Sequence, residues 1–389
     1  MSVNIAAQMT PAMRLNPFPM YRTARAMGGV VHIKQPPLWN VFRYEDVRTA
    51  LGDHARFSSR LGRESGPDSL ITSDPPRHSK LRALVKSAFT PRAIAGLQPR
   101  IATVAAELLD AAAARGEMDL VRDFAEPLPV LVIADMLGIP GQRRADFKHW
   151  SDLVVSGSDH LLMGDQAQIP DGYGEGMAAM HAYFAEVIAE RRVRPGEDLI
   201  SSLVSAEIDG EGLSDDDLDN FCWLLLVAGN ETTTNLIGNA VQVLLDEPEQ
   251  LERLRADADL LPGAVEEVLR HRAPVQAMFR RTLTEVQLGR HRIPAGELVI
   301  AWIGSANRDG SRFPDPDRFD ITRSPNPHLA FGHGIHTCLG APLARLEAKL
   351  GLSALIERFP RMRRAGRGAL EPVPGFILHG VRSLPLALA

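Results

Sequence analysis

Hydrophobic residues recur at helical spacing through most of the chain between Arg77 and Arg272. Glycine and proline interrupt this pattern often enough to predict several helices joined by short turns. Alternation typical of strands is present at positions 30–33, 39–42, 278–281, 286–288 and 298–301. A last pair of short strands is expected to flank Pro374-Gly375. The pattern therefore predicts a mainly α protein with small β-sheets, in the α+β class.

The longest predicted helix begins after Ser214 and continues to about Asp246, with Pro248 beyond its end. Ser214 is a typical N-cap, and the acidic residues 215–217 suit the positive end of a helix. At about 1.5 Å per residue, this helix is roughly 48 Å long, enough to cross the whole molecule. Its centre reads Ala-Gly-Asn-Glu-Thr-Thr-Thr over residues 228–234. Glycine and consecutive threonines are weak helix formers, as expected where a ligand needs room against the backbone.

Composition limits the class of protein and the compartment. The 389 residues carry 43 basic and 48 acidic side chains, and this balance argues against extensive nucleic-acid binding. Only Cys222 and Cys338 are present, which excludes a disulfide framework and favours a reducing compartment. The N-terminus lacks the order of a signal peptide, and no run of 18 apolar residues occurs. We therefore expect a soluble, cytoplasmic protein without membrane spans.

The strongest chemical signal is the run from Phe331 to Gly340, Phe-Gly-His-Gly-Ile-His-Thr-Cys-Leu-Gly. Its glycines allow tight turns and let a flat molecule approach the backbone. Cys338 stands just before a predicted helix that has Pro342 in its first turn, and the positive end of that helix should lower the pKa of the thiol. A glycine-rich turn with a structural cysteine is one alternative. A zinc site at His333, His336 and Cys338 is another, although no fourth ligand is evident.

This run resembles the haem-thiolate signature of the cytochromes P450, Phe-x-x-Gly-x-His/Arg-x-Cys-x-Gly, and matches it at the residues Phe331, Gly334, His336, Cys338 and Gly340. The resemblance covers essentially the whole chain and implies one P450 domain over residues 1–389, of the soluble bacterial type. It implies the P450 fold, in which the long central helix crosses over haem b. It also makes Cys338 the iron ligand, whose electron density favours O–O cleavage. The residues expected to line the haem on this side are Phe331, Gly332, His336 and Gly340.

The centre of the long helix resembles the family's oxygen-activation motif, Ala/Gly-Gly-x-Asp/Glu-Thr-Thr. By position, Glu231 is the acid and Thr232 the alcohol that deliver protons to bound dioxygen, while Ala228 and Gly229 lie against the haem. Thr233 remains an alternative for the hydroxyl role. A kinked core helix with buried threonines is the purely structural alternative.

Two further resemblances concern arginines. Glu267 and Arg270 share one helix face, and Pro316-Asp-Arg318-Phe319 follows about fifty residues later. These match the family's Glu-x-x-Arg and Pro-x-Arg-Phe motifs, which implies a buried structural triad of Glu267, Arg270 and Arg318 that supports the cysteine loop. Without the resemblance, Glu267 and Arg270 would read as a solvated surface pair.

The haem propionates need cationic partners. His78 and Arg82 lie four residues apart on one predicted helix, as in the family's His-x-x-x-Arg pattern. The resemblance adds His336 and Arg280 to this set, with Arg281 as an alternative to Arg280. Taken alone, His78 and Arg82 would read as an exposed helical pair.

The substrate pocket is assigned by resemblance only. Its walls are expected from the loop before Asp74, from a glycine-rich lid at residues 156–176, and from the residues Val227, Val275, Ala277, Met278, Phe376 and Ile377. Walls of this kind suit a hydrophobic substrate.

The resemblance implies a monooxygenase that inserts one oxygen atom from O2 by hydroxylation or epoxidation. No flavin or iron–sulfur motif is evident, so electrons are expected from ferredoxin or flavodoxin with its NAD(P)H reductase. We expect a monomer whose partner docks near Cys338, with the candidate contacts Lys80, Lys86, Arg92 and Arg345. The alternatives are a peroxide-driven peroxygenase and a haem-based sensor without turnover. The intact Glu231-Thr232 pair favours the monooxygenase over both.

Overall fold

The computed structural model describes residues 9–35, 37–61, 69–162, 171–366 and 368–388. Its α-helices are α2 (Pro11–Leu15), α3 (Phe18–Ala26), α4 (Tyr44–Gly52), α5 (Arg77–Ala88), α6 (Pro91–Gly96), α7 (Gln98–Ala113), α8 (Pro127–Met136), α9 (Arg144–Leu162), α10 (Tyr173–Val193), α11 (Leu199–Val204), α12 (Asp215–Asp246), α13 (Pro248–Ala256), α14 (Leu261–His271), α15 (Ile303–Ala306) and α16 (Ala341–Arg358). Shorter helical turns are the π-helix η1 (Val121–Ala125) and the 3-10 turns η2 (Gly141–Arg143), η4 (Ala258–Leu260) and η5 (Gly334–His336). The strands are β1 (Val30–Lys34), β2 (Pro37–Val41), β3 (Phe57–Ser58), β4 (Glu117–Asp119), β5 (Glu207–Ile208), β6 (Glu211–Gly212), β7 (Met278–Thr282), β8 (Val286–Leu288), β9 (His291–Ile293), β10 (Leu298–Ala301), β11 (Arg363–Arg364) and β12 (Pro385–Ala387).

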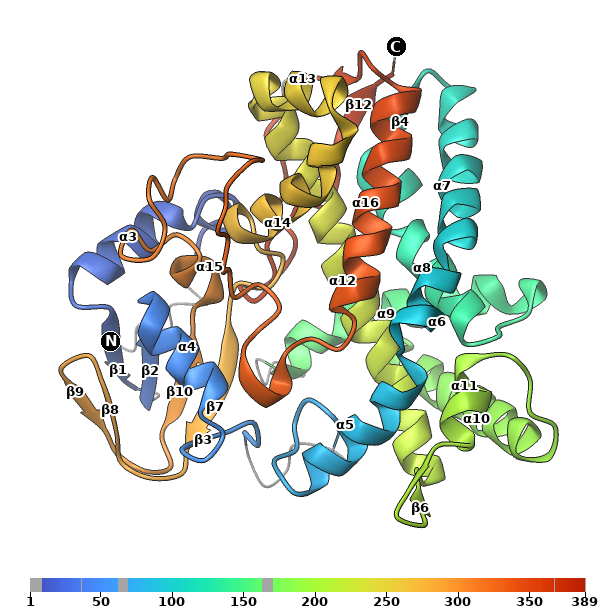
Figure 1. Ribbon diagram of the computed structural model, residues 1–389, viewed down its shortest axis with the longest axis horizontal. Helices are drawn as coiled ribbons and strands as arrows, with labels where there is room; N and C mark the ends of the chain where they lie inside the picture. The colour runs from blue at the N-terminus through green and yellow to red at the C-terminus, as the bar shows by residue number, and fades with distance from the viewer. Residues whose placement is uncertain (1–8, 36, 62–68, 163–170, 367, 389) are drawn as a thin grey trace.

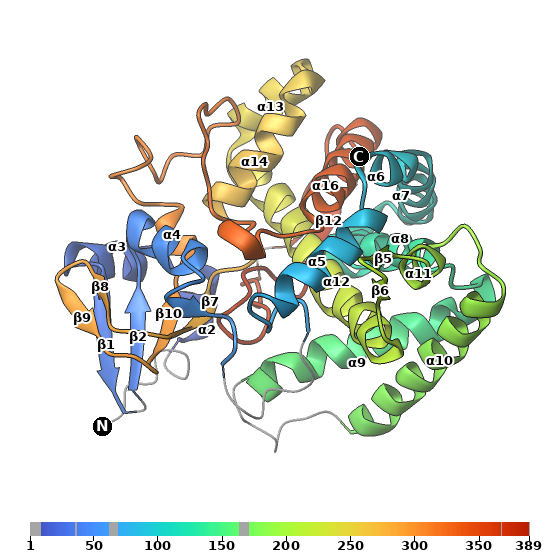
Figure 2. The same ribbon diagram turned by 60° about the horizontal axis from the view of Figure 1, so that its bottom comes forward.

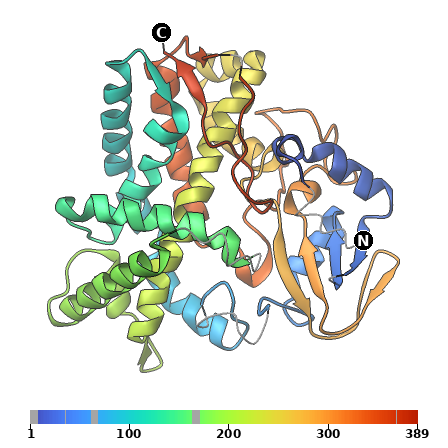
Figure 3. The ribbon, with the colours of Figure 1, turned by 180° about the vertical axis from the view of Figure 1, so that it is seen from behind.

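Helix α12 forms the axis of the helical part, as the sequence predicts. Ser214 and Asp217 make reciprocal side-chain to backbone bonds at its start, a capping box that satisfies two free amide groups. The helix ends at Asp246, two residues before Pro248. Helices α8, α9, α10 and α16 all pack against it, and Figures 1 and 3 show it running through the middle of the helical part. Its central residues are therefore enclosed by other helices on several sides.

The main sheet lies beside the helices, next to α3 and α4 (Figure 1). Its strand order is β1-β2-β10-β7-β3, with β2 and β10 parallel and the other neighbours antiparallel. A smaller sheet, β11-β12-β4, lies at the far end of α16. The segment that carries Cys338, orange in Figure 2, lies between the sheet and the helical part.

The strand pair predicted around Pro374-Gly375 forms only as a short pairing, and one prediction lies outside the described residues. Pro372 and Val381 make one antiparallel bridge across this loop, and the amide of Arg382 donates to the carbonyl of Glu371 at 2.9 Å. The loop also pairs with a distant segment, because Val275 and Leu378 form a second isolated bridge and the amide of Gln276 donates to the carbonyl of Ile377 at 2.7 Å. Local alternation does not reveal this second pairing, since Val275 lies far earlier in the chain. Residues 163–170 of the predicted lid lie outside the described residues.

Apolar burial holds the helices together in two large clusters. One joins α7, α8, α12, α14 and α16, and the other joins α5, α9, α10 and the first half of α12. Because α12 contributes to both, it is fixed along its whole length. Among the described residues, none of the helices combines the length and the apolar character that crossing a membrane requires.

Candidate active site

Cys338 is presented by a tight loop that ends at the start of α16. Gly332 and Gly334 adopt φ angles of +74° and +75°, which only glycine adopts without strain. Gly334 also lies directly against Gly52 of α4, where a Cβ atom would be 2.8 Å from the Gly52 Cα. The amide of Cys338 donates to the carbonyl of Phe331 at 2.8 Å. The loop is therefore held between α4 and α16 in one conformation.

The electrostatics of the Cys338 thiol differ from the sequence-based expectation. Its side chain is exposed, yet desolvation by the surrounding protein raises the pKa of the thiol. The amides of Gly340 and Ala341 and the charges of Arg82 and Arg345 oppose this effect without overcoming it. The helix start alone therefore does not make Cys338 anionic. A thiolate here needs the further positive charge of a bound metal.

That metal would have to bring most of its own ligands. Within the described residues, no group of three or more His, Cys, Asp or Glu side chains is placed to hold an ion. The alternative zinc site at His333, His336 and Cys338 is therefore not formed. A single cysteine suits an iron already coordinated by a macrocycle.

Two histidines and two arginines gather next to the cysteine loop. His78 and His336 lie with their ring centroids 4.1 Å apart, and Arg82 donates to the Thr337 carbonyl at 2.6 Å. Burial lowers the pKa of His336 to about 3, and the nearby His78, Arg280 and Arg82 act in the same direction. In the described part of the chain, both ring nitrogens of His78 and Nε2 of His336 are buried without a hydrogen-bond partner.

Buried donors without acceptors are costly, so this cluster fits anionic groups that the chain itself does not supply. The two propionates of a haem are such groups. His78, Arg82, Arg280 and His336 would hold them, and Cys338 would ligate the iron. The residues present therefore fit haem b.

The choice between Arg280 and Arg281 follows from the strand β7, whose neighbouring side chains point to opposite faces. Arg280 is buried and close enough to His336 to lower its pKa. Arg281 points away and donates to the carbonyls of Leu61 and Gly296, at 3.0 and 2.6 Å. The geometry thus places Arg280, and not Arg281, beside the histidines.

At the centre of α12, the two candidate hydroxyls face different surroundings. Ala228 is exposed, and the Thr232 hydroxyl donates to its carbonyl at 2.6 Å, one helical turn back. Thr233 is buried and shares a hydrogen bond with Glu347, in the second turn of α16. Burial raises the pKa of Glu347 to about 8. Since α16 begins three residues after Cys338, this contact brings the centre of α12 close to the cysteine loop.

Sequence comparison then identifies the family. The family model described as Cytochrome P450 matches residues 20–363. The chain belongs to the cytochrome P450 family. It is similar to the putative cytochrome P450 YjiB of Bacillus subtilis, with 44% identity over 95% of this chain and 93% of that protein. It is 42% identical to erythromycin C-12 hydroxylase of Saccharopolyspora erythraea, over 86% of each chain.

Solved structures agree with this assignment. The crystal structure of CYP109E1 from Bacillus megaterium in complex with testosterone matches with a TM-score of 0.88 and 42% identity, over 96% of this chain and 99% of that one. The fold is therefore that of a P450, as the sequence predicts. The protein is a haem-thiolate monooxygenase that binds haem b, and such enzymes bind hydrophobic substrates and receive electrons from a redox partner.

The structural triad of this P450 corrects one predicted residue. Glu267 and Arg270 form a fully buried pair with two bonds of 2.8 Å. Arg318 does not join them, because its side chain is 65% exposed and lies 3.9 Å from Asp320. Arg323 takes that place and donates to Glu267 Oε1 at 3.1 Å. Only the backbone of Arg318 participates, since its carbonyl accepts a bond from Arg270 at 2.9 Å.

Gly229 also affects how two helices pack. A Cβ atom on Gly229 would lie 2.6 Å from Cδ1 of Ile133 in α8. The missing side chain therefore allows α8 to pack closely against α12. The contact of Gly229 with haem stays a prediction.

The predicted pocket residues divide into two groups. Ala277 and Phe376 are buried in a core cluster with Trp302, so they support the wall without facing a substrate. The half-buried residues are Val227, Val275, Met278 and Ile377. The hydrogen bond between Gln276 and Ile377 holds the last two predicted wall segments together.

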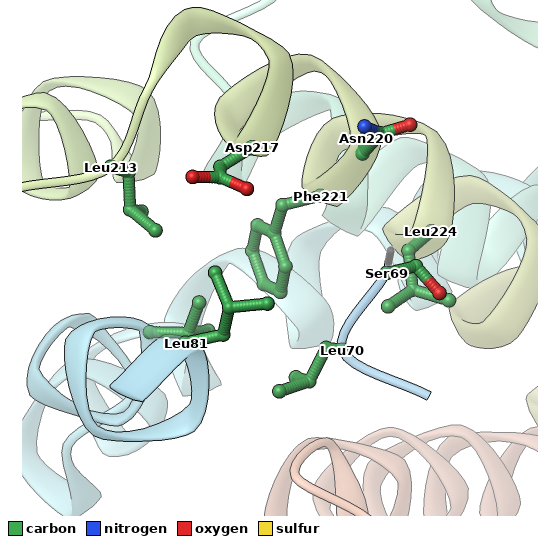
Figure 4. A pocket seen from close by; sticks show the side chains of 9 residues that line it. Ser69, Leu70, Leu81, Leu213, Asp217, Asn220, Phe221 and Leu224 are labelled. Carbon is green, nitrogen blue, oxygen red and sulfur yellow. The ribbon is translucent and has the colours of Figure 1, made fainter. Parts of the chain in front are cut away.

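A separate small cavity lies between α5 and the first half of α12 (Figure 4). Its volume is about 10 Å³, enough for one water molecule and too small for a substrate. It is lined by Ser69, Leu70, Leu81, Val85, Leu213, Asp217, Asn220, Phe221 and Leu224.

Two residues of the site region were not found from the sequence. No motif in the sequence marks Arg323 as a partner of Glu267. For Glu347 the sequence does contain a signal, because its spacing of four residues from both Leu343 and Gly351 places it on the buried face of a predicted helix.

Proposed function

We propose that this P450 hydroxylates or epoxidises a hydrophobic substrate of steroid size. The half-buried apolar side chains of Val227, Val275, Met278 and Ile377 support this substrate class. So does the similarity to CYP109E1, a protein solved with testosterone. We further propose that the enzyme is a single catalytic domain and acts as a cytoplasmic monomer.

Bound haem supplies the iron at which O2 is reduced. Cys338 would ligate that iron, and His78, Arg82, Arg280 and His336 would hold the propionates. Thr232 would supply a hydrogen-bond donor and a proton at its hydroxyl for the oxygen chemistry that the haem supports, while Glu231 would bring protons from solvent. The residues that fix the cysteine loop from behind are Glu267, Arg270 and Arg323.

The observation that carries the oxygen-activation role is the different placement of the two threonines. The Thr232 hydroxyl lies on the side of α12 that Ala228 leaves exposed, whereas Thr233 is engaged with Glu347. A hydroxyl needs only to exchange its bond with the Ala228 carbonyl to donate to a ligand. Thr232 therefore suits the role, and Thr233 does not.

The test is turnover of testosterone with a bacterial ferredoxin and its NADPH reductase. A titration of the Soret band first establishes that testosterone binds. Thr232→Ala should keep haem and testosterone affinity, yet divert most electrons from product to hydrogen peroxide. Thr233→Ala is the matched control and should keep the ratio of product to NADPH consumed. Unchanged coupling in Thr232→Ala, or the same loss in Thr233→Ala, contradicts the assignment.

We also propose ferredoxin as the partner, docking beside the cysteine loop. Lys86 and Arg92 are exposed. Lys80 is paired with Glu211, and Arg345 makes bonds of 2.6 and 2.9 Å to Glu266. Lys86 and Arg92 are thus the better contacts of the four. The double variant Lys86→Glu with Arg92→Glu should be reduced more slowly by ferredoxin, and its reduction rate should depend less on salt concentration. A double variant with the wild-type rate and salt dependence counts against this docking face.

A further inference from the structure

The back of the oxygen-activation turn carries a buried polar link to α9. Asn230 is 3% exposed and lies two residues from Thr232, which places it on nearly the opposite side of α12. Its Nδ2 donates to Oγ of Ser151 at 2.6 Å, and Ser151 is fully buried on α9. The bond therefore joins two helices whose remaining contacts here are mostly apolar.

The other side of the same asparagine makes a weaker contact. Oδ1 of Asn230 lies 3.4 Å from the Thr234 hydroxyl, whose single hydrogen is shared with the nearer Ala125 carbonyl at 3.1 Å. The donor of Asn230 is thus committed to α9, and its acceptor takes only a share of one hydrogen within α12. The bond to Ser151 is therefore the main polar restraint on this side chain, because breaking it would leave a buried donor without a partner.

The surroundings make this arrangement specific. Phe147 and Trp150 of α9 are buried around Ser151. The residue before Asn230 is Gly229, and its lack of a side chain lets Ile133 of α8 pack directly against α12. Apolar packing sets the distance between helices, whereas packed helices can still slide along one another by small amounts. The hydrogen bond between Asn230 and Ser151 fixes the position along the helix axis.

We infer that Asn230 is a positioning residue that, through Ser151, holds the turn from Ala228 to Thr232 in register with α9. This inference rests on the proposed role of Thr232. Loss of the hydrogen bond between Asn230 and Ser151 removes no group that touches haem or substrate, but it lets Thr232 move away from its position.

The experiment compares Ser151→Ala with Asn239→Ala, using haem-loaded full-length protein. Asn239 is a matched control on the same helix, buried and bonded to the carbonyls of Arg272 and His379 at 3.1 and 2.8 Å. The first readout needs no turnover: hydrogen exchange of the amides at residues 228–232. Ser151→Ala should speed it about fivefold, the effect of one buried neutral hydrogen bond on local opening. Asn239→Ala should leave those amides unchanged.

The second readout is product formed per NADPH with testosterone and ferredoxin. Ser151→Ala should lower it severalfold while keeping testosterone affinity, and Asn239→Ala should not change it. The reciprocal swap, Asn230→Ser with Ser151→Asn, restores a donor and an acceptor and should recover both readouts.

The outcomes separate the two proposals. Wild-type exchange rates in Ser151→Ala, or equal acceleration in Asn239→Ala, overturn the positioning role. Accelerated exchange with unchanged coupling overturns the link to Thr232. If the exchange result holds while wild-type protein forms no product from testosterone, the proposed substrate class fails and the positioning bond stands.

Discussion

Replacement of Arg323 by alanine tests the revised triad most directly. Nε of Arg323 donates to Glu267 at 3.1 Å, and its other nitrogens donate to the carbonyls of Pro314, Asp315 and Arg318 at 2.8, 3.1 and 3.2 Å. The side chain is 11% exposed and that of Glu267 is 0% exposed. Alanine would remove all four bonds and one positive charge from beside a buried carboxylate.

The magnitude follows from these contacts. Removing one partner of a buried ion pair costs about 3–5 kcal/mol. Glu267 would keep Arg270, the Asn326 amide at 3.1 Å and the Asp320 backbone at 3.0 Å, so the lower end applies. An unfolding entropy of about 2.1 cal/mol/K per residue over 389 residues gives roughly 0.8 kcal/mol/K. Arg323→Ala should therefore lower the midpoint of thermal unfolding by about 4 °C.

Arg318→Ala is the matched control, because it removes an arginine five residues away that is largely exposed. A weak surface pair contributes no more than about 0.5 kcal/mol, so the midpoint should move by less than about 1 °C. Both variants are measured at one scan rate, by unfolding and by loss of the Soret band. Equal shifts, or a larger shift for Arg318→Ala, would refute the assignment of Arg323.

Two further predictions concern cysteine and acid chemistry. Cys338→Ala should abolish the red-shifted absorption of the reduced carbon monoxide complex, whereas Cys222→Ala, at a fully buried thiol, should retain it; the opposite pattern would exclude Cys338 as the ligand. Burial raises the pKa of Glu347 from the ordinary 4.5 to about 8. Between these two pH values the folded state holds a proton that the unfolded state has lost, so the free energy of unfolding should fall as the pH rises from about 4.5 to about 8. Glu347→Gln should flatten that decline in urea titrations across this range, and an unchanged slope would mean that the carboxyl is already ionised.

Features that depend on neighbours along the chain were predictable from the sequence. Ser214 and Asp217 cap α12 because a serine and an acid three residues apart suit a helix start in any fold. Cys338 before α16 follows from the glycines and from Pro342 in the same way. The antiparallel bridge between Pro372 and Val381, on the two sides of Pro374-Gly375, belongs to the same group, whereas the bridge between Leu378 and Val275 shows the limit. Pairing over such a distance depends on how the whole chain folds.

The site residues divide along the same line. His78 and Arg82 come together because four residues make one helical turn, and Arg280 is distinguished from Arg281 by strand alternation. The direction of the Cys338 pKa was wrong because the helix start is local, whereas desolvation is exerted by the whole surrounding protein. The burial of Ala277 and Phe376 was missed for a related reason. Their positions within the predicted wall segments are local, but their burial against Trp302 is decided by tertiary packing.

The exchange of Arg318 for Arg323 shows why motif transfer succeeds for one end of an ion pair and fails for the other. Glu267 and Arg270 belong to one helix, so their spacing alone brings them within bonding distance. The third cation comes from a loop, and a guanidinium on a long side chain can reach the carboxylate from several backbone positions. In this loop the carbonyl of Arg318 accepts bonds from both Arg270 and Arg323. The backbone of Arg318 thus takes part in the buried cluster while its side chain does not. The second positive charge beside the Glu267 carboxylate comes from Arg323.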